Sequence, residues 1–152
     1  LTKNINRFEW FLEKSTEMGV YEITPLITKF TERCKLNLER SKRILISATK
    51  QSIRFNLPKL NKPTNFNDYI DQENKNFNSF ICTCTNLNIP LLSKEIKSNC
   101  NLNILVGPEG GFSKDEINLA KNAKFVPVSL GDHRLRTETA GILACSIFIL
   151  KN

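Results

Sequence analysis

Histidine is nearly absent from this sequence, since His133 is the only one. That scarcity excludes a metal site built from several histidines, and any Ser-His-Asp triad would have to use His133 itself. The five cysteines form no zinc knuckle, because the only close pair, Cys82 and Cys84, has a single residue between them. Their odd number predicts buried free thiols in a protein of a reducing compartment. We therefore expect no bound metal.

Long apolar runs are also missing. No run approaches the roughly 18 apolar residues that span a bilayer, and residues 1–10 lack the apolar stretch of a signal peptide. We expect no membrane partner, and a location in the cytoplasm or an organelle matrix. The 152 residues are enough for one domain with a hydrophobic core. The first residue is Leu1 rather than Met, which suggests a fragment of a longer protein.

Positive charge is concentrated in the first part of the chain, and the formal net charge is +7. Residues 1–62 hold thirteen Lys and Arg against six Asp and Glu, whereas residues 63–152 hold nine of each kind. A basic half favours a polyanionic partner, most simply RNA or DNA. A solvated basic surface without a partner explains the charge equally well.

The common nucleotide-binding motifs are missing as well. The sequence has no G-x-G-x-x-G, and no G-K-[ST] follows its glycines. Instead, residues 105–117 read LVGPEGGFSKDEI. The apolar residues that end at Val106 predict a buried strand. The glycines then predict a sharp turn with exposed backbone amides; they are Gly107, Gly110 and Gly111.

A helix is expected directly after this glycine loop, because Ser113 and Glu116 have the spacing of a capping box. A strand, a glycine loop and a capped helix form a ligand-binding edge in an α/β sheet. Glu109 places a negative charge where a phosphate would lie. The loop is therefore expected to bind something other than a polyphosphate.

Hydrophobic periodicity divides the rest of the chain into alternating helices and strands. Helices are expected at 4–18, 38–55, 90–97, 113–122 and 136–150, and strands within 20–30 and at 77–85, 102–106 and 125–130. Residues 58–72 are expected to be a loop with one short helical turn. This alternation predicts an α/β fold with a mostly parallel sheet and helices on both faces. The last helix is apolar on nearly every side, which predicts burial inside the domain or in an interface between subunits.

Three loops should meet at the carboxyl edge of this sheet, where ligands of such folds bind: the loop around Thr85, residues 107–112 and residues 130–137. The third belongs to the segment SLGDHRLRTETA, residues 129–140. Thr137 is expected to cap the last helix, with Glu138 in its first turn, where the helix dipole favours a negative charge. A purely structural interpretation is an ion pair between Arg136 and Glu138 that seats the helix.

GPEGGFSKDEI and LGDHRLRTETA, in this order, resemble the paired signatures of the ribosomal RNA small subunit methyltransferase E family. That family belongs to the SPOUT class of S-adenosylmethionine-dependent RNA methyltransferases. Residues 13–28, EKSTEMGVYEITPLIT, resemble its E-K-A-T-E-L-G-V followed by I-x-P. Residues 48–60, ATKQSIRFNLPKL, resemble its A-x-E-Q-x-x-R-x-x-x-P, although Lys50 stands where that pattern has Glu. The resemblance covers nearly the whole chain, and the two late motifs are its most specific part.

The resemblance implies a trefoil knot in the C-terminal half, with S-adenosylmethionine held in the knot mostly by backbone groups of the three loops. Carried over to this sequence, the cofactor-binding residues are Thr85, Val106, Gly107, Gly110, Leu130, Gly131, Leu135 and Arg136. The resemblance also implies a homodimer, for which the helix at 4–18 and the last helix are candidate interfaces. Family members carry an N-terminal RNA-binding domain with a PUA-like barrel. This chain has no room for that domain, so residues 1–152 would be a single SPOUT domain.

The implied reaction is methyl transfer to N3 of a uridine in small-subunit (16S) ribosomal RNA, either free or in the 30S subunit. The weakly acidic N3 proton must leave, so a general base or a cation that stabilises the uridine anion would help. Arg136 is the candidate cation, and Glu138 or Glu109 the candidate base. Both carboxylates could equally well cap helix N-termini. The candidates for phosphate contact are Arg33, Lys35, Arg40, Lys42, Arg43 and Arg54.

Two other functions stay open. One is a SPOUT methyltransferase for another RNA, such as tRNA. SPOUT enzymes of that kind typically have S-L-N where the segment at residues 129–140 of this chain has L-R-T-E-T-A. The other is a non-catalytic module for RNA binding or ribosome assembly.

Overall fold

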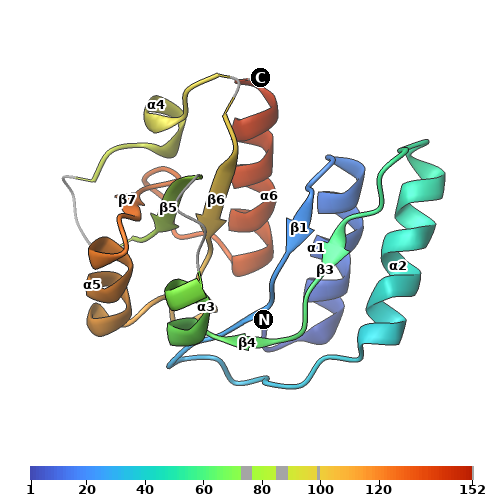
Figure 1. Cartoon of the computed structure of the whole chain (residues 1–152), viewed down its shortest axis with the longest axis horizontal. Helices are drawn as coiled ribbons and strands as arrows, with labels where there is room; N and C mark the ends of the chain where they lie inside the picture. Colours follow the sequence, from blue (N-terminus) through green and yellow to red (C-terminus); the bar gives the residue numbers. More distant parts are fainter. Residues whose placement is uncertain (73–76, 85–88, 99, 152) are drawn as a thin grey trace.

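The computed structural model describes residues 1–72, 77–84, 89–98 and 100–151. Its helices are α1 (Ile5–Glu17), α2 (Leu38–Gln51), α3 (Phe66–Gln72), α4 (Leu92–Glu95), α5 (Lys114–Asn122) and α6 (Thr137–Ile149). Its strands are β1 (Glu22–Ile23), β2 (Leu26–Ile27), β3 (Lys59–Leu60), β4 (Thr64–Asn65), β5 (Asn78–Cys82), β6 (Leu102–Leu105) and β7 (Val126–Val128). Strands and helices alternate after residue 77, as the sequence predicts (Figure 1).

Three parallel strands form the main sheet, in the order β6-β5-β7. The central strand β5 pairs Ile81 with Leu105 of β6, and Phe80 with Val126 of β7. The strand pairs of the described residues, including the short pairs β1–β3 and β2–β4, are all parallel. The predicted parallel α/β fold is confirmed. The trefoil knot is not directly seen and stays a prediction.

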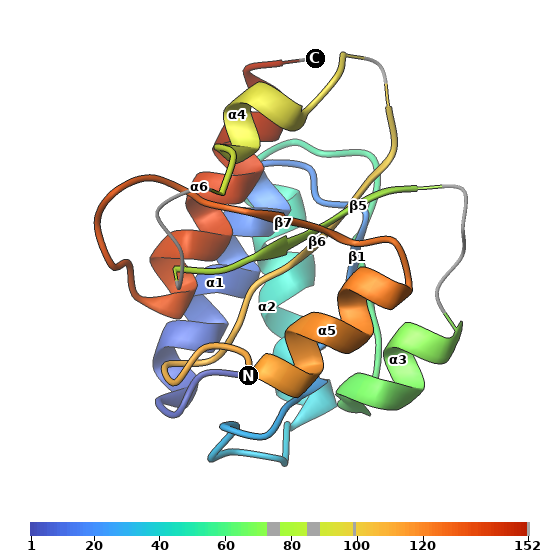
Figure 2. The same cartoon turned by 90° about the vertical axis from the view of Figure 1, so that its left-hand side faces the viewer.

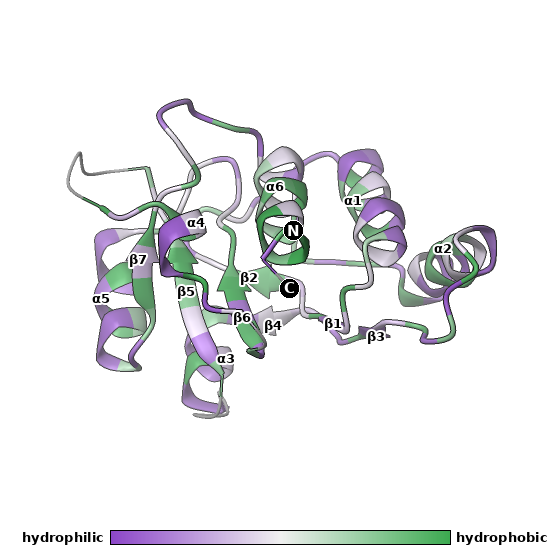
Figure 3. Ribbon diagram, turned by 90° about the horizontal axis from the view of Figure 1, so that it is seen from above, coloured by the Kyte–Doolittle hydropathy of each residue, from purple (hydrophilic) through white to green (hydrophobic). Residues whose placement is uncertain are grey.

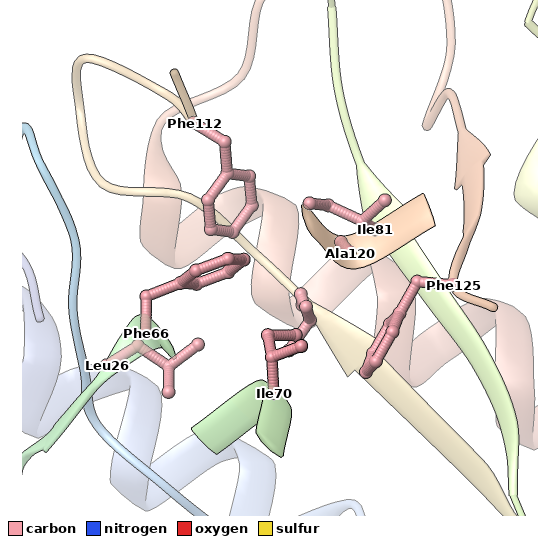
Figure 4. Close-up of a cluster of buried hydrophobic side chains, with 8 residues drawn as sticks. Leu26, Phe66, Ile70, Ile81, Phe112, Ala120 and Phe125 are labelled. Carbon is pink, nitrogen blue, oxygen red and sulfur yellow. The ribbon is translucent and has the colours of Figure 1, made fainter. Parts of the chain in front are cut away.

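Helices α3 and α5 cover one face of this sheet. Ile81 and Leu105 are buried there beneath the two helices, and Figure 4 shows most of the cluster that they join. Its other buried members are Leu26, Phe66, Ile70, Phe112, Ala120 and Phe125. The ring centroids of Phe66 and Phe112 lie 5.4 Å apart, so the last residue of the loop 107–112 is anchored in the core.

Helices α4 and α6 cover the opposite face. Neighbouring residues of a strand point to opposite sides, so Phe80 faces away from Ile81. It packs with Val128 of β7, Leu92 of α4 and Ala144 of α6. The prediction of helices on both faces is therefore confirmed.

The first part of the chain packs beside α6 rather than on the sheet. Helix α1 lies between α6 and α2, and α6 lies between α1 and the sheet, as Figure 3 shows from above. Phe8 and Leu12 of α1 are buried against Leu45 of α2. Gly141 of α6 is a point of close approach: a Cβ there would lie 2.6 Å from Cε2 of Phe11.

Burial of α6 within the domain is partial. Glu138, Gly141 and Ala144 are buried, whereas Leu150, the residue after the helix, is 86% exposed. The interface between subunits, which is the other explanation of its apolar surface, stays a prediction.

Three sequence-based expectations are wrong. Residues 58–72 contain the expected short helical turn, as α3, but the rest is not only loop: β3 and β4 lie there too, because two-residue strands leave no periodic pattern to detect. The second helix ends at Gln51 rather than at residue 55, so Arg54 lies beyond it. The N-cap of α6 is Arg136 rather than Thr137, and its side chain makes no capping hydrogen bond.

Candidate functional site

Two of the three expected loops meet at the carboxyl edge of the sheet. The glycine loop follows β6 and the segment before α6 follows β7, so both leave the same edge (Figure 2). The guanidinium Nη2 of Arg134 donates a hydrogen bond to the backbone carbonyl of Glu109 at 3.2 Å. This contact joins the loops directly. Thr85, in the remaining expected loop, lies outside the described residues.

The glycine loop needs glycine at each of its three positions. Gly111 has φ +73, a conformation that side chains rarely adopt. A Cβ at Gly107 would lie 3.0 Å from the backbone of Gly111, and one at Gly110 would lie 2.8 Å from Cβ of Phe30. The N–H of Gly111 closes the turn by donating to the carbonyl of Pro108 at 2.8 Å. The loop is therefore compact and packed against residue 30.

The predicted capping box is present at the start of α5. The N–H of Ser113 donates to Oε2 of Glu116 at 2.7 Å, and the Glu116 N–H donates back to Oγ of Ser113. The other carboxylate oxygen, Oε1, accepts from the N–H of Lys29 at 2.8 Å. Glu116 thus fixes the helix start and ties residues 28–31 to the glycine loop. The link to Lys29 was not predicted, since nothing in the sequence pairs residues so far apart.

Glu109, a candidate base, is exposed but engaged. Its Oε1 accepts a hydrogen bond from the N–H of Lys3 at 3.0 Å. The carbonyl of Lys3 in turn accepts from Nε of Arg33 at 3.2 Å. The first residues of the chain therefore support the glycine loop from outside.

The loop before α6 presents open backbone. Gly131 has φ +133, and no atom lies within 4 Å of the position that its Cβ would take. Its backbone is held by Ser129, whose Oγ accepts from the Gly131 N–H and donates to the Gly131 carbonyl. Leu130 and Leu135 are half-buried, and Arg136 is exposed. A ligand recognised by backbone groups could approach this segment without meeting a side chain at residue 131.

Glu138, the other candidate base, is buried in the first turn of α6, with 9% of its side chain exposed. Its Oε1 lies 3.5 Å from Nε of Arg7 in α1, whereas its Oε2 has no hydrogen-bond partner among the described residues. The ion pair of Glu138 is thus with Arg7 and not with Arg136, which corrects the structural interpretation of the sequence. Sequence spacing could not reveal this pair, because α1 and α6 lie at opposite ends of the chain.

The six candidates for phosphate contact are all exposed, but three make contacts within the chain. Arg40 forms an ion pair with Glu9 at 2.6 Å, and Arg54 donates twice to the carbonyl of Glu17. Arg33 donates to Lys3, as described above. The other three, Lys35, Lys42 and Arg43, make no such contact among the described residues.

The cysteines are free thiols, as predicted, but none is fully buried: Cys82, Cys100 and Cys145 are half-buried. Cys34 and Cys84 are exposed. Burial raises the pKa of the Cys82 thiol to about 12 and that of Cys145 to about 11. His133 is exposed. Across the described ranges no group of His, Cys, Asp and Glu is arranged to hold a metal ion, and no helix is long and apolar enough to cross a membrane.

Parallel strands covered by helices, with glycine loops meeting at the carboxyl edge, define a ligand-binding α/β domain. Comparison with known proteins identifies the family to which this domain belongs. A family model described as an RNA methyltransferase domain matches residues 1–149, and the chain belongs to that family.

Relatives support the resemblance noted in the sequence. The chain is 35% identical over 146 residues to the ribosomal RNA small subunit methyltransferase E of Rickettsia conorii, a match that covers 88% of this chain and 55% of that protein. The chain thus spans about half the length of this relative.

Solved structures share the fold. A probable rRNA methyltransferase from Porphyromonas gingivalis matches with a TM-score of 0.90 and 38% identity, over 95% of this chain and 62% of that one. The small subunit methyltransferase E of Neisseria gonorrhoeae, solved bound to S-adenosylmethionine, matches with a TM-score of 0.84 and 31% identity. That match covers 96% of this chain and 61% of the other.

Proposed function

We propose that this chain is the catalytic domain of an S-adenosylmethionine-dependent methyltransferase that modifies N3 of a uridine in small-subunit ribosomal RNA. The observation that carries the proposal is the contact between Arg134 and Glu109, which brings the two signature loops together at the ligand-binding edge of an RNA methyltransferase domain. The relative from Neisseria gonorrhoeae, bound to S-adenosylmethionine, supports the choice of cofactor.

The cofactor would lie against the meeting loops, and the residues here fit it. Open backbone at Gly131 and the compact turn at Gly107 and Gly110 allow a nucleoside to approach main-chain groups closely. The proposed cofactor-binding residues are Val106, Gly107, Gly110, Leu130, Gly131, Leu135 and Arg136, together with Thr85. S-adenosylmethionine supplies the methyl group, and its cationic sulfonium tolerates the nearby carboxylate of Glu109.

Residues of this chain would accept the N3 proton of the uridine and stabilise the negative charge that remains. Arg136 is exposed and has no ion-pair partner among the described residues, so its guanidinium is available to stabilise a uridine anion. Of the two candidate bases, Glu138 keeps one carboxylate oxygen without a partner, whereas Oε1 of Glu109 already accepts from Lys3. The geometry therefore favours Glu138 as the proton acceptor and Glu109 as a support of the loop.

The RNA would contact the exposed cations. Lys35, Lys42 and Arg43 are proposed to bind phosphates, because their side chains make no ion pair or hydrogen bond among the described residues. Arg33, Arg40 and Arg54 would first have to leave their partners. A homodimer, formed through the exposed apolar surface of α6 with α1, is part of the same proposal.

Calorimetric titration with S-adenosylhomocysteine tests the proposal. We expect saturable binding by the folded chain, lost in Gly131→Val, since a side chain there is strained at φ +133 and fills the open backbone. The neighbouring Asp132→Ala, an exposed loop change, is the matched control and should bind normally. A folded wild-type chain that does not bind would instead favour a non-catalytic RNA-binding or ribosome-assembly module. Binding together with methylation of tRNA alone would favour a methyltransferase for another RNA.

A further inference from the structure

Residues 29–35 form a largely exposed stretch between β2 and α2, which runs along the lower side of the molecule in Figure 1. The stretch carries three cations and one carboxylate. That carboxylate belongs to Glu32 and forms an ion pair with Lys3 at 2.9 Å. The exposed surface is therefore positively charged, which favours a polyanionic partner.

Phe30 lies in this basic stretch and is 45% exposed. It belongs to none of the hydrophobic clusters formed by the described residues. Its side chain packs on the glycine loop instead, since a Cβ at Gly110 would lie 2.8 Å from Cβ and 3.1 Å from Cγ of Phe30. The side chain thus covers Gly110, while almost half of the residue stays open to solvent.

Hydrogen bonds fix the backbone on both sides of Phe30. The N–H of Thr28 donates to Oγ1 of Thr31 at 2.9 Å, and the N–H of Thr31 donates to the carbonyl of Thr28 at 3.0 Å. The N–H of Lys29 donates to Glu116, as described above. An aromatic side chain on a fixed backbone has little conformational freedom to lose when it binds a ligand.

An exposed aromatic side chain between cations favours single-stranded nucleic acid as the ligand. Bases stack on aromatic rings, and Lys and Arg bind the phosphates of the same strand. Lys29 directly precedes Phe30 and Lys35 follows it by five positions; neither lysine side chain makes an ion pair or hydrogen bond among the described residues. These cations suit RNA better than S-adenosylmethionine, whose sulfonium is itself positively charged.

We propose that Phe30 stacks on an unpaired base beside the target uridine, while Lys29 and Lys35 bind phosphates of the same RNA strand. The location suits this role, because Gly110 beneath Phe30 belongs to the loop that is proposed to bind the cofactor. The stretch also lies outside α1 and α6, the two helices proposed as the interface between subunits. The proposal rests on the proposed RNA substrate, but concerns a base other than the one that is methylated.

Fluorescence anisotropy with two labelled RNA heptamers separates stacking from phosphate binding. One heptamer is heptauridine, and the other consists of abasic nucleotides, which keep the phosphates but offer no base. We expect the wild type to bind heptauridine about tenfold or more tightly than the abasic heptamer. Phe30→Leu removes the aromatic ring, so it should lower the affinity for heptauridine about tenfold and leave that for the abasic heptamer unchanged. Phe30→Tyr keeps a ring and should stay within about twofold of the wild type.

Matched variants elsewhere in the chain control for exposure and charge. Phe55 is 99% exposed and follows the opposite end of α2, so Phe55→Leu should change neither affinity. Lys29→Met should weaken binding of both heptamers by the same factor and reduce the slope of log affinity against log salt by about 0.7. Lys121→Met, at an exposed position of α5, should do neither. Melting temperatures of all variants show whether each is folded.

The kinetics of methyl transfer to unmodified 30S subunits test where the stacked base lies. A base beside the target contributes to binding of the strand and not to the reaction at N3. We therefore expect Phe30→Leu to raise KM for the subunits about tenfold and to leave kcat within about twofold of the wild type. A lower kcat with unchanged KM would refute the placement of this base beside the target.

Three binding results would overturn the proposal. They are heptauridine binding by Phe30→Leu that is as tight as that of the wild type, equal losses on both heptamers, and a wild type that binds neither heptamer, which would leave this surface for a protein partner. Loss of S-adenosylhomocysteine affinity in Phe30→Leu with unchanged RNA binding would place the ring in the cofactor site instead.

Binding of S-adenosylhomocysteine by the wild type separates this proposal from the proposed function. A chain that binds it but shows no dependence of RNA affinity on Phe30 refutes the stacking residue and leaves the proposed function standing. A chain that binds heptauridine through Phe30 but does not bind S-adenosylhomocysteine refutes the methyltransferase and leaves the stacking residue.

Discussion

The N–H of Lys3 donates a hydrogen bond to the side-chain carboxylate of Glu109 at 3.0 Å, across a sequence separation of 106 residues. Arg134 holds the backbone carbonyl of the same residue at 3.2 Å. Glu109 is thus the point where the first residues of the chain, the glycine loop and the loop before α6 are joined. Because both its side chain and its backbone carbonyl are hydrogen-bonded, Glu109 is well placed to stabilise the binding loop.

This arrangement distinguishes support from catalysis at Glu109. Glu109→Gln keeps an oxygen that accepts from Lys3, so we expect affinity for S-adenosylhomocysteine and methyl transfer to stay within about twofold of the wild type. Glu109→Ala removes the acceptor, and should cost about 1 kcal/mol of cofactor affinity, measured by calorimetry. Loss of methyl transfer in the Gln variant, with cofactor binding intact, would make Glu109 the general base instead.

Gly110 is expected to tolerate no side chain while Phe30 is present. A Cβ at residue 110 would lie 2.8 Å from Cβ and 3.1 Å from Cγ of Phe30, so Gly110→Ala must displace one of the two segments. We expect a loss of about 1–3 kcal/mol in the free energy of unfolding, measured by urea denaturation.

The double variant Gly110→Ala with Phe30→Ala provides the control for this prediction. Truncation of Phe30 removes Cγ and the ring, and the variant should recover part of the lost stability relative to the sum of the single changes. If the loss of stability in the double variant equals the sum of the losses in the two single variants, the contact between residues 110 and 30 does not cause the destabilisation by Gly110→Ala.

Glu116 should be among the most sensitive carboxylates of the chain. Both its oxygens accept backbone N–H groups, from Ser113 and from Lys29, and Glu116→Gln replaces one acceptor with a donor. We expect about 1–3 kcal/mol of destabilisation, seen as a lower melting temperature. Asp115→Asn, at an exposed position of the same helix turn, should change stability by less than about 0.5 kcal/mol. Equal effects of the two variants would contradict this account.

The buried thiol of Cys82 predicts a loss of stability at alkaline pH. Its pKa is raised by burial from 9.0 to about 12, so between these values the unfolded chain holds fewer protons than the folded one. The free energy of unfolding therefore falls as pH rises through this window. Cys82→Ala should reduce the slope in urea denaturation between pH 9 and pH 10.5. An unchanged slope would show that Cys82 does not contribute.

Local patterns explain why some of the site was predictable. The strand, the glycines and the capping box of Ser113 and Glu116 lie within a few residues of one another, so propensity and spacing identify them directly. The strands β3 and β4 were missed, because two residues carry no period and their partners lie more than thirty positions earlier in the chain. The ion pair of Glu138 with Arg7 was missed for a related reason, since only the packing of α1 on α6 creates it.

The most direct test of the central claim is a mass-spectrometric map of methylated uridines in small-subunit ribosomal RNA, with and without the gene for this protein. The account predicts that N3-methyluridine disappears from one position when the gene is deleted and returns when the gene is restored. N3-methyluridine that persists at its full level after the deletion would contradict it.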